Sequence, residues 1–199
     1  FAAEPYFCSI MKNADAKQTY ANVMKVYFIF LLFIFLGVIA YMDILQYFVG
    51  EEYRSGLKVV PILLAANLCL GVYYNLSVWY KVSDKTIYGA YISIIGAVVT
   101  LVLNYLLVPQ FGYMGAAYTT LICYFLIMVI CWAFGQKYYP VKYPLKRLFL
   151  YTMLAFGLFL LMNNNTIANI PLKLFVNSIL LLAFAVVAYW FELRKALKR

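Results

Sequence analysis

Histidine is absent from this chain of 199 residues, and only seven Asp and Glu stand against 16 Lys and Arg. Without histidine the chain lacks the side chain that most often serves as general base and metal ligand near neutral pH. None of the seven acids lies in the middle of an apolar stretch, and no HExxH motif or phosphate-binding glycine loop occurs. We therefore predict no catalytic residues, no metal site and no cofactor, and we expect that the protein is not an enzyme.

Cysteine is also sparse, and the four cysteines have no paired spacing such as CxxC. Cys8, Cys69, Cys123 and Cys131 all lie in or beside apolar stretches. Buried thiols of this kind pack as small apolar side chains. We predict neither a disulfide framework nor a cysteine metal site.

Charged residues make up 12% of the chain and hydrophobic residues 67%, whereas globular domains carry about 25% charge. Six apolar stretches follow one another, and a membrane-spanning helix needs about 20 such residues, in a range of roughly 17–25. The fifth stretch is short by this measure and the others fit. The stretches are Val26–Met42, Val59–Trp79, Ile87–Val108, Tyr113–Phe134, Leu148–Met162 and Leu174–Phe191. The sequence predicts an all-α integral membrane protein with six transmembrane helices.

The cations alternate between the segments that flank these stretches. Thirteen of the 16 lie before the first stretch, in the second and fourth loops and in the tail, and the loop around Pro109 carries no charge. Because Lys and Arg accumulate in cytoplasmic loops, we predict that both ends are cytoplasmic. The net charge of +9 then serves orientation and contact with anionic membrane lipids. We expect no nucleic-acid partner, since no basic run is interleaved with aromatic residues in a soluble segment.

Aromatic residues gather near the predicted ends of the spans. Examples are the pairs Trp79–Tyr80, Tyr138–Tyr139 and Tyr189–Trp190. Amphipathic rings favour the level of the lipid headgroups. These pairs are therefore predicted to form interfacial belts.

The second stretch is the most polar. At 100° per residue, Asn67, Gly71, Tyr74 and Asn75 share one face of a helix, and Lys81 at its end lies on the same side. This face either lines a cavity or forms hydrogen bonds that hold neighbouring helices together. Pro61 removes a backbone donor and is expected to bend or weaken the helix at its outer end.

The third stretch has a ridge of small residues. The ridge consists of Gly89, Ser93, Gly96, Ala97, Thr100 and Asn104. Small residues allow two helix backbones to approach closely, so we expect packing in preference to cavity lining.

Residues 104–120 read NYLLVPQFGYMGAAYTT. This segment resembles the N-x-x-L-[IV]-P-x-[FY]-G-x-x-G-A-A-x-x-T signature of the multidrug/oligosaccharidyl-lipid/polysaccharide flippase superfamily. We expect a proline that ends one helix, a glycine turn, and a second helix that starts without side-chain bulk. The signature residues are Asn104, Pro109, Gly112, Gly115, Ala116 and Ala117.

The resemblance extends along most of the chain. Residues 1–28 resemble the segment between the eighth and ninth helices of bacterial polysaccharide-biosynthesis flippases of the O-antigen type, and residues 58–86 resemble their tenth helix. The six stretches then correspond to helices nine to fourteen of fourteen, with the N-terminal lobe missing. This implies the end of a truncated helix and a cytoplasmic loop over 1–25. It also implies four helices of the C-terminal lobe over 26–136, and two further helices with a basic tail over 137–199.

The resemblance implies a transporter of the bacterial inner membrane. Such proteins move an oligosaccharide linked to undecaprenyl diphosphate from the cytoplasmic to the outer leaflet by alternating access. The polar face of the second stretch would line the path, and the anionic head group would meet Arg54, Lys58 and Lys81, for which snorkelling at the interface is the plain alternative. Implied partners are the substrate, the missing lobe, membrane lipids and polysaccharide-assembly enzymes. A cation-coupled multidrug or metabolite antiporter and a non-transporting scaffold for glycosyltransferases remain as alternatives.

Overall fold

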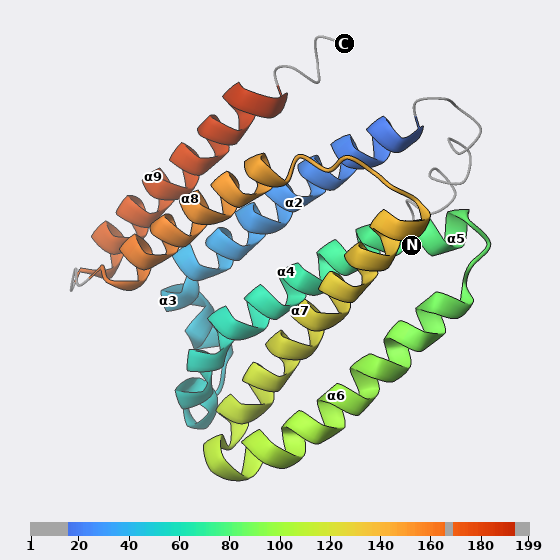
Figure 1. Ribbon diagram of the computed structural model, residues 1–199. Helices are drawn as coiled ribbons and strands as arrows, with labels where there is room; N and C mark the ends of the chain where they lie inside the picture. The colour runs from blue at the N-terminus through green and yellow to red at the C-terminus, as the bar shows by residue number, and fades with distance from the viewer. Residues whose placement is uncertain (1–15, 166–168, 194–199) are drawn as a thin grey trace. The chain divides into compact units, whose positions relative to one another are not determined.

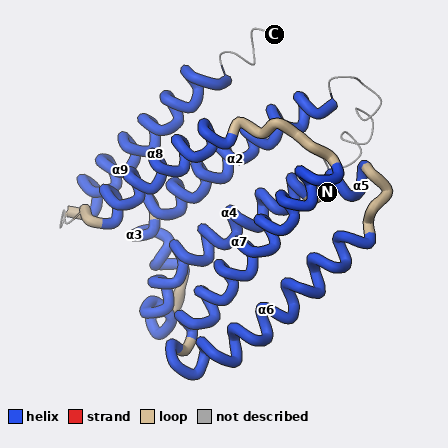
Figure 2. The backbone as a smooth tube through the Cα atoms, in the orientation of Figure 1, coloured by secondary structure: helices blue, strands red, loops and turns tan. Residues whose placement is uncertain are grey.

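The computed structural model describes residues 16–165 and 169–193, and its regular secondary structure is entirely helical within these ranges (Figure 1 and Figure 2). This confirms the predicted all-α class. The elements are α2 (Ala16–Ala40), α3 (Met42–Leu45), η1 (Gln46–Phe48), η2 (Glu51–Val59), α4 (Val60–Leu76), α5 (Val78–Val82), α6 (Ile87–Phe111), α7 (Tyr113–Tyr138), α8 (Leu145–Asn163), α9 (Ile170–Ala188) and the π-helical turn η3 (Tyr189–Leu193).

Six helical segments of the described chain are long and apolar enough to cross a membrane. They are Lys17–Ala40, Glu51–Val82, Ile87–Phe111, Tyr113–Tyr138, Leu145–Asn163 and Ile170–Phe191. Each overlaps one predicted stretch, and the fifth reaches 19 residues because α8 begins three residues before Leu148 and ends one residue after Met162. The protein is therefore a multi-pass membrane protein, in contact with membrane lipids.

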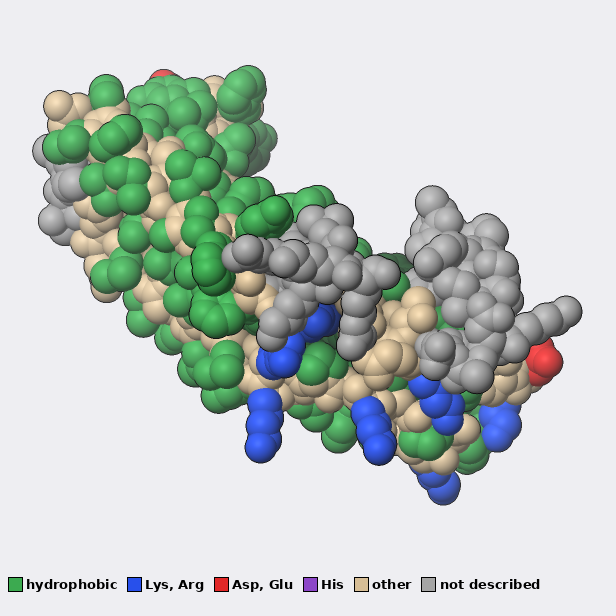
Figure 3. Space-filling model, turned by 90° about the horizontal axis from the view of Figure 1, so that it is seen from above, with side chains coloured by type: hydrophobic (Ala, Val, Ile, Leu, Met, Phe, Trp, Pro, Cys, Tyr) green, Lys and Arg blue, Asp and Glu red, His purple; other side chains and the backbone are tan. Residues whose placement is uncertain are grey.

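The outer surface of the helices agrees with this environment. On α6 the side chains of Ile94, Leu101 and Tyr105 are 60%, 72% and 81% exposed, and apolar side chains cover much of the face seen in Figure 3. Soluble proteins rarely expose apolar patches of this extent. In a bilayer the same side chains face lipid, where exposure of an apolar group has no hydration cost.

By its internal contacts the chain forms two compact units. Among the described residues, unit 1 contains 16–25 and 59–143, and unit 2 contains 26–58, 144–165 and 169–193. Helix α2 contributes its first turns to unit 1 and the remainder to unit 2. The predicted grouping into 26–136 and 137–199 stays a prediction, and Cys8 and the expected end of a truncated helix lie outside the described residues.

In unit 1, α7 packs against α4 on one side and α6 on another (Figure 1). Gly112 alone connects α6 to α7, with φ of +55°, a region that L side chains rarely adopt. A Cβ added to Gly115 would lie 2.4 Å from the carbonyl oxygen of Leu107. Only glycine therefore allows these two backbones to meet as they do.

The expectation that Pro109 ends the helix is wrong. Helix α6 continues through Pro109 to Phe111 and ends at Gly112, whose N–H donates to the carbonyl of Val108 over 2.8 Å. Pro109 lies in the last turn of α6, and because proline has no N–H it removes one i→i−4 bond there without ending the helix. The reversal of direction thus depends on the positive φ of Gly112 and on the missing side chain of Gly115.

The second span differs from the prediction at both ends. It begins as the 3-10 helix η2 and becomes α-helical at Val60, so Pro61 stands in the first turn of α4. Proline is well tolerated there because the first-turn N–H groups have no intrahelical partner. Pro61 thus stands where the span changes from 3-10 to α-helix, and the expected bending or weakening there stays a prediction. The α-helix is interrupted at Ser77, whose hydroxyl donates to the Tyr74 carbonyl over 2.7 Å.

In unit 2, polar groups connect α9 to the end of α2 and to α3. The Asn177 amide, which is 2% exposed, donates to the carbonyl of Ala40 over 3.2 Å. The hydroxyls of Tyr41 and Ser178 are 3.0 Å apart, and Lys173 forms an ion pair of 2.8 Å with Asp43. These contacts satisfy a carbonyl at the C-terminus of α2, where an α-helix leaves its last carbonyls without partners.

Candidate functional site

The polar face predicted on the second stretch lies on α4 and is partly exposed. Asn67 is exposed, Tyr74 is 60% exposed and Asn75 is half-buried, whereas Gly71 is buried. The helix packs on α7. Its buried side chains are those of Ala66, Val72, Tyr73 and Leu76.

The hydrogen bond of Asn67 stays within α4. The Asn67 amide donates to the carbonyl of Leu63, four residues earlier in the same helix, over 2.8 Å. The side chain thus keeps its acceptor oxygen for other partners. This geometry favours a surface available to water or a ligand over the alternative of interhelical hydrogen bonding.

The three candidate cations fall in different units and are described separately. In unit 2, Arg54 donates to the Gln46 carbonyl over 3.3 Å, approaches Glu51 at 3.5 Å and lies 5.4 Å from the ring centre of Tyr47. Lys58, one turn later, is exposed. In unit 1, Lys81 is exposed in the last turn of α5.

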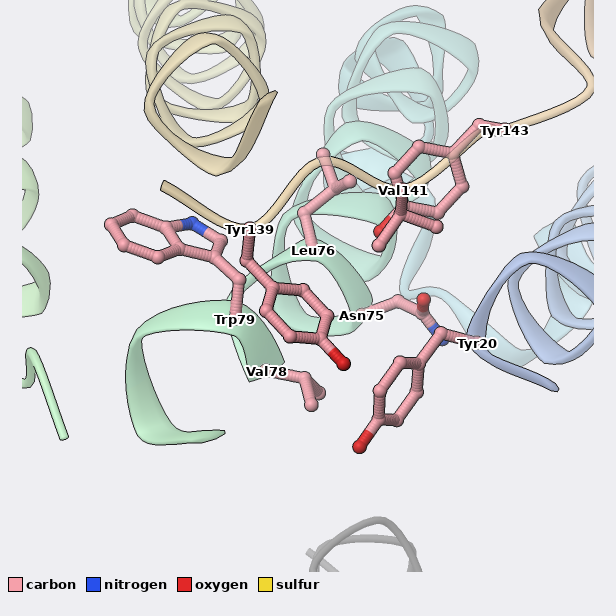
Figure 4. Close-up of a pocket in the computed structure, with 8 residues that line it drawn as sticks. All are labelled: Tyr20, Asn75, Leu76, Val78, Trp79, Tyr139, Val141 and Tyr143. Atoms are coloured by element: carbon pink, nitrogen blue, oxygen red, sulfur yellow. The ribbon is translucent and has the colours of Figure 1, made fainter. Parts of the chain in front are cut away.

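A small cavity of about 10 Å³ lies beside the interruption at Ser77. Figure 4 shows its lining, which comes from α2, from α4 and α5, and from the chain that follows α7. The lining residues are Tyr20, Asn75, Leu76, Val78, Trp79, Tyr139, Val141 and Tyr143. A space of this size holds about one water molecule, and Asn75 and the tyrosines supply polar partners.

Tyr139 and Tyr143 of this cavity remain protonated over the physiological range. Burial raises the pKa of the Tyr139 phenol. Burial, with smaller contributions from Cys131, Tyr139 and Tyr20, raises the pKa of Tyr143. A neutral phenol can donate as well as accept a hydrogen bond, so this lining suits water or another neutral polar group.

Trp79 and Tyr80 do not form an interfacial belt, contrary to the prediction. They are only 4% and 8% exposed. The Trp79 ring stacks on Tyr138, with centres 5.8 Å apart and planes at 17°, while Gly135 leaves room for the indole on α7. The indole packs inside unit 1 because Gly135 on α7 has no side chain in its way. The spacing of aromatic residues in the sequence does not reveal this contact.

Lysines meet aromatic rings at this end of unit 1. The ammonium groups of Lys85 and Lys137 lie 4.1 Å and 5.6 Å from the centre of the Tyr138 ring, and that of Lys17 lies 4.9 Å from Tyr139. Such cation–π contacts are favourable by ~0.5–1 kcal/mol at exposed sites. The contacts position positive charge beside the rings at the ends of the spans.

The predicted ridge on α6 is confirmed as a packing surface in part. A Cβ on Gly96 would lie 3.2 Å from Ile127, and the Cys123 thiol lies 3.3 Å from the Gly96 carbonyl and 3.1 Å from the Thr100 hydroxyl. Ser93 and Ala97 are exposed. Among the signature residues, Gly115 and Ala117 are buried, while Asn104 and Ala116 are half-buried.

Sequence reasoning did not identify Tyr20, Val141 and Tyr143 as neighbours of Asn75, because they lie outside the apolar stretches. Nor did it identify Asn177, which lies beside Ser178 in an otherwise apolar run. An Asn inside a predicted span was the one available signal. Within residues 16–165 and 169–193, no three His, Cys, Asp or Glu side chains form a group that could hold a metal.

No protein-family model, curated protein or solved structure matches this chain.

Proposed function

We propose that the chain forms part of a transporter that moves a lipid-linked oligosaccharide from the cytoplasmic to the outer leaflet of a bacterial inner membrane. In this proposal the six spans correspond to the C-terminal half of a flippase that works by alternating access. The protein would move its substrate without catalysing a covalent change.

The observation that carries the proposal is the exposed polar face of α4. Asn67 and Tyr74 lie on a membrane-spanning helix, away from the residues that pack on α7. Polar side chains inside a membrane almost always face a protein partner or a water-filled cavity. A sugar and diphosphate head group needs such a surface, because its transfer into hydrocarbon without polar partners has a large free-energy cost.

Two further features support the proposal. The resemblance of residues 104–120 to the flippase signature coincides with a hairpin in which Gly112 and Gly115 have clear steric roles. Lys58 in unit 2 and Lys81 in unit 1 are exposed near opposite ends of the span that contains α4, and each would contact an anionic head group at its own end of the path.

Export by the intact protein tests the proposal directly. Deletion of the gene should leave lipid-linked repeat units on the cytoplasmic leaflet, and the wild-type gene should restore export. Asn67→Leu should impair export with normal insertion, because leucine is favourable in a membrane helix and no interhelical bond of Asn67 is lost. Asn75→Leu should do the same.

Two matched variants serve as controls. Asn163→Leu makes the same change at an exposed position in the last turn of α8 and should leave export intact. Gly96→Leu should reduce the amount of folded protein, because its side chain would push into Ile127. Normal surface polysaccharide in the deletion strain, with no accumulated precursor and no paralogue, would contradict the proposal. Export unaffected by both α4 variants would favour a scaffold.

The proposed orientation has its own test. Single cysteines near Gly50 and Asn165 should react with a membrane-impermeant thiol reagent in intact cells, whereas cysteines near Asp84 and Tyr139 should react only after lysis. The opposite pattern would place the cation-rich loops outside the cell and contradict cytoplasmic ends.

A further inference from the structure

An apolar groove of about 300 Å³ lies within unit 2, between α2 and α9. The lining residues are Val26, Ile29, Phe30, Phe33, Phe184, Ala185 and Ala188. Ile29, Phe184 and Ala188 are at most 8% exposed and form its floor, whereas Phe30 is 58% exposed at the rim. The groove therefore has a packed base and an open side, and its lining contains no polar side chain.

The dimensions of the groove suit one hydrocarbon chain. Along α2 it extends from Val26 to Phe33, which is ~10 Å at 1.5 Å per residue. Its volume of about 300 Å³ leaves room for a hydrocarbon segment of this length, and every side chain of its lining is apolar.

At the Val26 end of the groove, the side chains of α2 change from apolar to polar. Along α2, Gln18, Asn22, Ile29 and Phe33 follow at spacings of four, seven and four residues, which places them on one side of the helix. That side is polar and exposed at Gln18 and Asn22 and apolar at Ile29 and Phe33.

Helix α9 shows the same boundary at the matching end. Directly after Ala188, Tyr189 and Trp190 are 51% and 61% exposed, as expected of rings at the level of lipid headgroups. An apolar groove that ends at a polar and aromatic boundary matches the division of a phospholipid into an acyl tail and a headgroup.

We propose that this groove binds one acyl chain of a bilayer phospholipid, with the headgroup at the level of Tyr189 and Trp190. Ala185 and Ala188 have side chains small enough to leave this space open on α9. Phospholipid is the most abundant molecule in the surrounding membrane, so mass action favours it over rarer lipids. The proposal is independent of the transport proposal above.

Photo-crosslinking in the intact protein tests this site. The photoreactive residue p-benzoylphenylalanine replaces Phe33 in the groove or, as a control, Leu182 on the exposed side of α9 (62% exposed). The protein is reconstituted with palmitoyl-oleoyl phosphatidylglycerol, extracted, exchanged into detergent and irradiated. A phospholipid retained in the groove should give an adduct of its mass at position 33, while position 182 should give mainly detergent adducts.

A second test fills the groove with a larger side chain and compares the result with the same substitution outside it. Ala185→Phe should abolish most of the phospholipid adduct at position 33 and reduce the phospholipid that copurifies, whereas Leu182→Phe should change neither. Ala185→Leu serves the same purpose if the phenylalanine variant does not fold. Only detergent adducts at position 33, an adduct of isoprenoid mass from native membranes, a crosslink to another protein chain, or a phospholipid adduct unchanged by Ala185→Leu would each overturn the proposal.

Discussion

Unit 1 and unit 2 hold their membrane helices together by different means. In unit 1, α6 and α7 approach closely where side chains are missing, because Gly115 places backbone against Leu107 and Gly96 accommodates Ile127. One hydrogen bond, from the Tyr88 hydroxyl to the Tyr138 hydroxyl over 2.7 Å, also joins the two helices at one end. In unit 2, α9 is held to the corner after α2 by side-chain polar groups, with Asn177 bonded to the Ala40 carbonyl and Lys173 paired with Asp43. Both are known routes to helix association in lipid, where apolar contact alone gives little driving force.

The difference teaches where each unit should be sensitive to substitution. Close backbone contact depends on shape, so added volume at the glycines should be harmful in unit 1 and loss of the Thr100 hydroxyl should matter little. Polar bonds depend on partners, so loss of one partner in unit 2 leaves the other without compensation.

The largest effect is expected for Gly115→Ala. The new Cβ would lie 2.4 Å from a backbone oxygen that cannot rotate away, so we expect a destabilisation of at least ~3 kcal/mol, at the upper end of overpacking costs. Thermal unfolding monitored by size-exclusion chromatography measures it. Gly157→Ala is the control, since nothing lies within 4 Å of its Cβ, and equal stability of the two variants would contradict the steric role of Gly115.

The next largest effect is expected for Asn177→Leu in unit 2. The change leaves the Ala40 carbonyl without its side-chain donor in a site where Asn177 is 2% exposed. We expect a loss of about 1–2 kcal/mol, measured as a lower melting temperature in detergent. The matched change Asn163→Leu, at an exposed position, should leave the melting temperature nearly unchanged.

A smaller effect is expected for the ion pair of Lys173 and Asp43. The two side chains are 24% and 28% exposed and 2.8 Å apart, so a double-mutant cycle with Lys173→Gln and Asp43→Asn should give a coupling of ~0.5–1 kcal/mol. The coupling should fall as salt rises. The pair of Arg54 and Glu51, longer at 3.5 Å and with Glu51 87% exposed, should give less. A larger coupling for Arg54 and Glu51 would contradict the expectation that the shorter and less exposed pair contributes more stability.

The smallest effect is expected for Thr100→Val in unit 1. The Thr100 hydroxyl bonds only to the weak acceptor Sγ of Cys123, at 3.1 Å, and valine keeps the shape of the side chain. We expect a change below ~0.5 kcal/mol, again by melting temperature. A loss as large as that of Asn177→Leu would show that polar bonding matters equally in both units and remove the distinction between them.

The candidate site could be predicted from sequence where it follows helical periodicity. The face shared by Asn67, Tyr74 and Asn75 depends only on 100° per residue, and α4 has that geometry. The cavity beside Asn75 could not be predicted, because Tyr20 and Tyr143 reach it from distant segments. The bonds of Asn177 were also beyond prediction, since no local pattern names the carbonyl of Ala40 as its partner.

The sequence by itself determined that this is a six-span helical membrane protein, since length and hydropathy of each segment are local properties and lipid requires every backbone group to bond within its own helix. It also determined the tight turn near Gly112 and Gly115, because only glycine suits the backbone there. Tertiary structure alone decided that Trp79 is buried against Gly135, that α6 continues past Pro109, and that α2 and α9 leave a groove between them. Each of these features depends on which helix surfaces meet. Those contacts are decided jointly by residues that lie far apart in the chain.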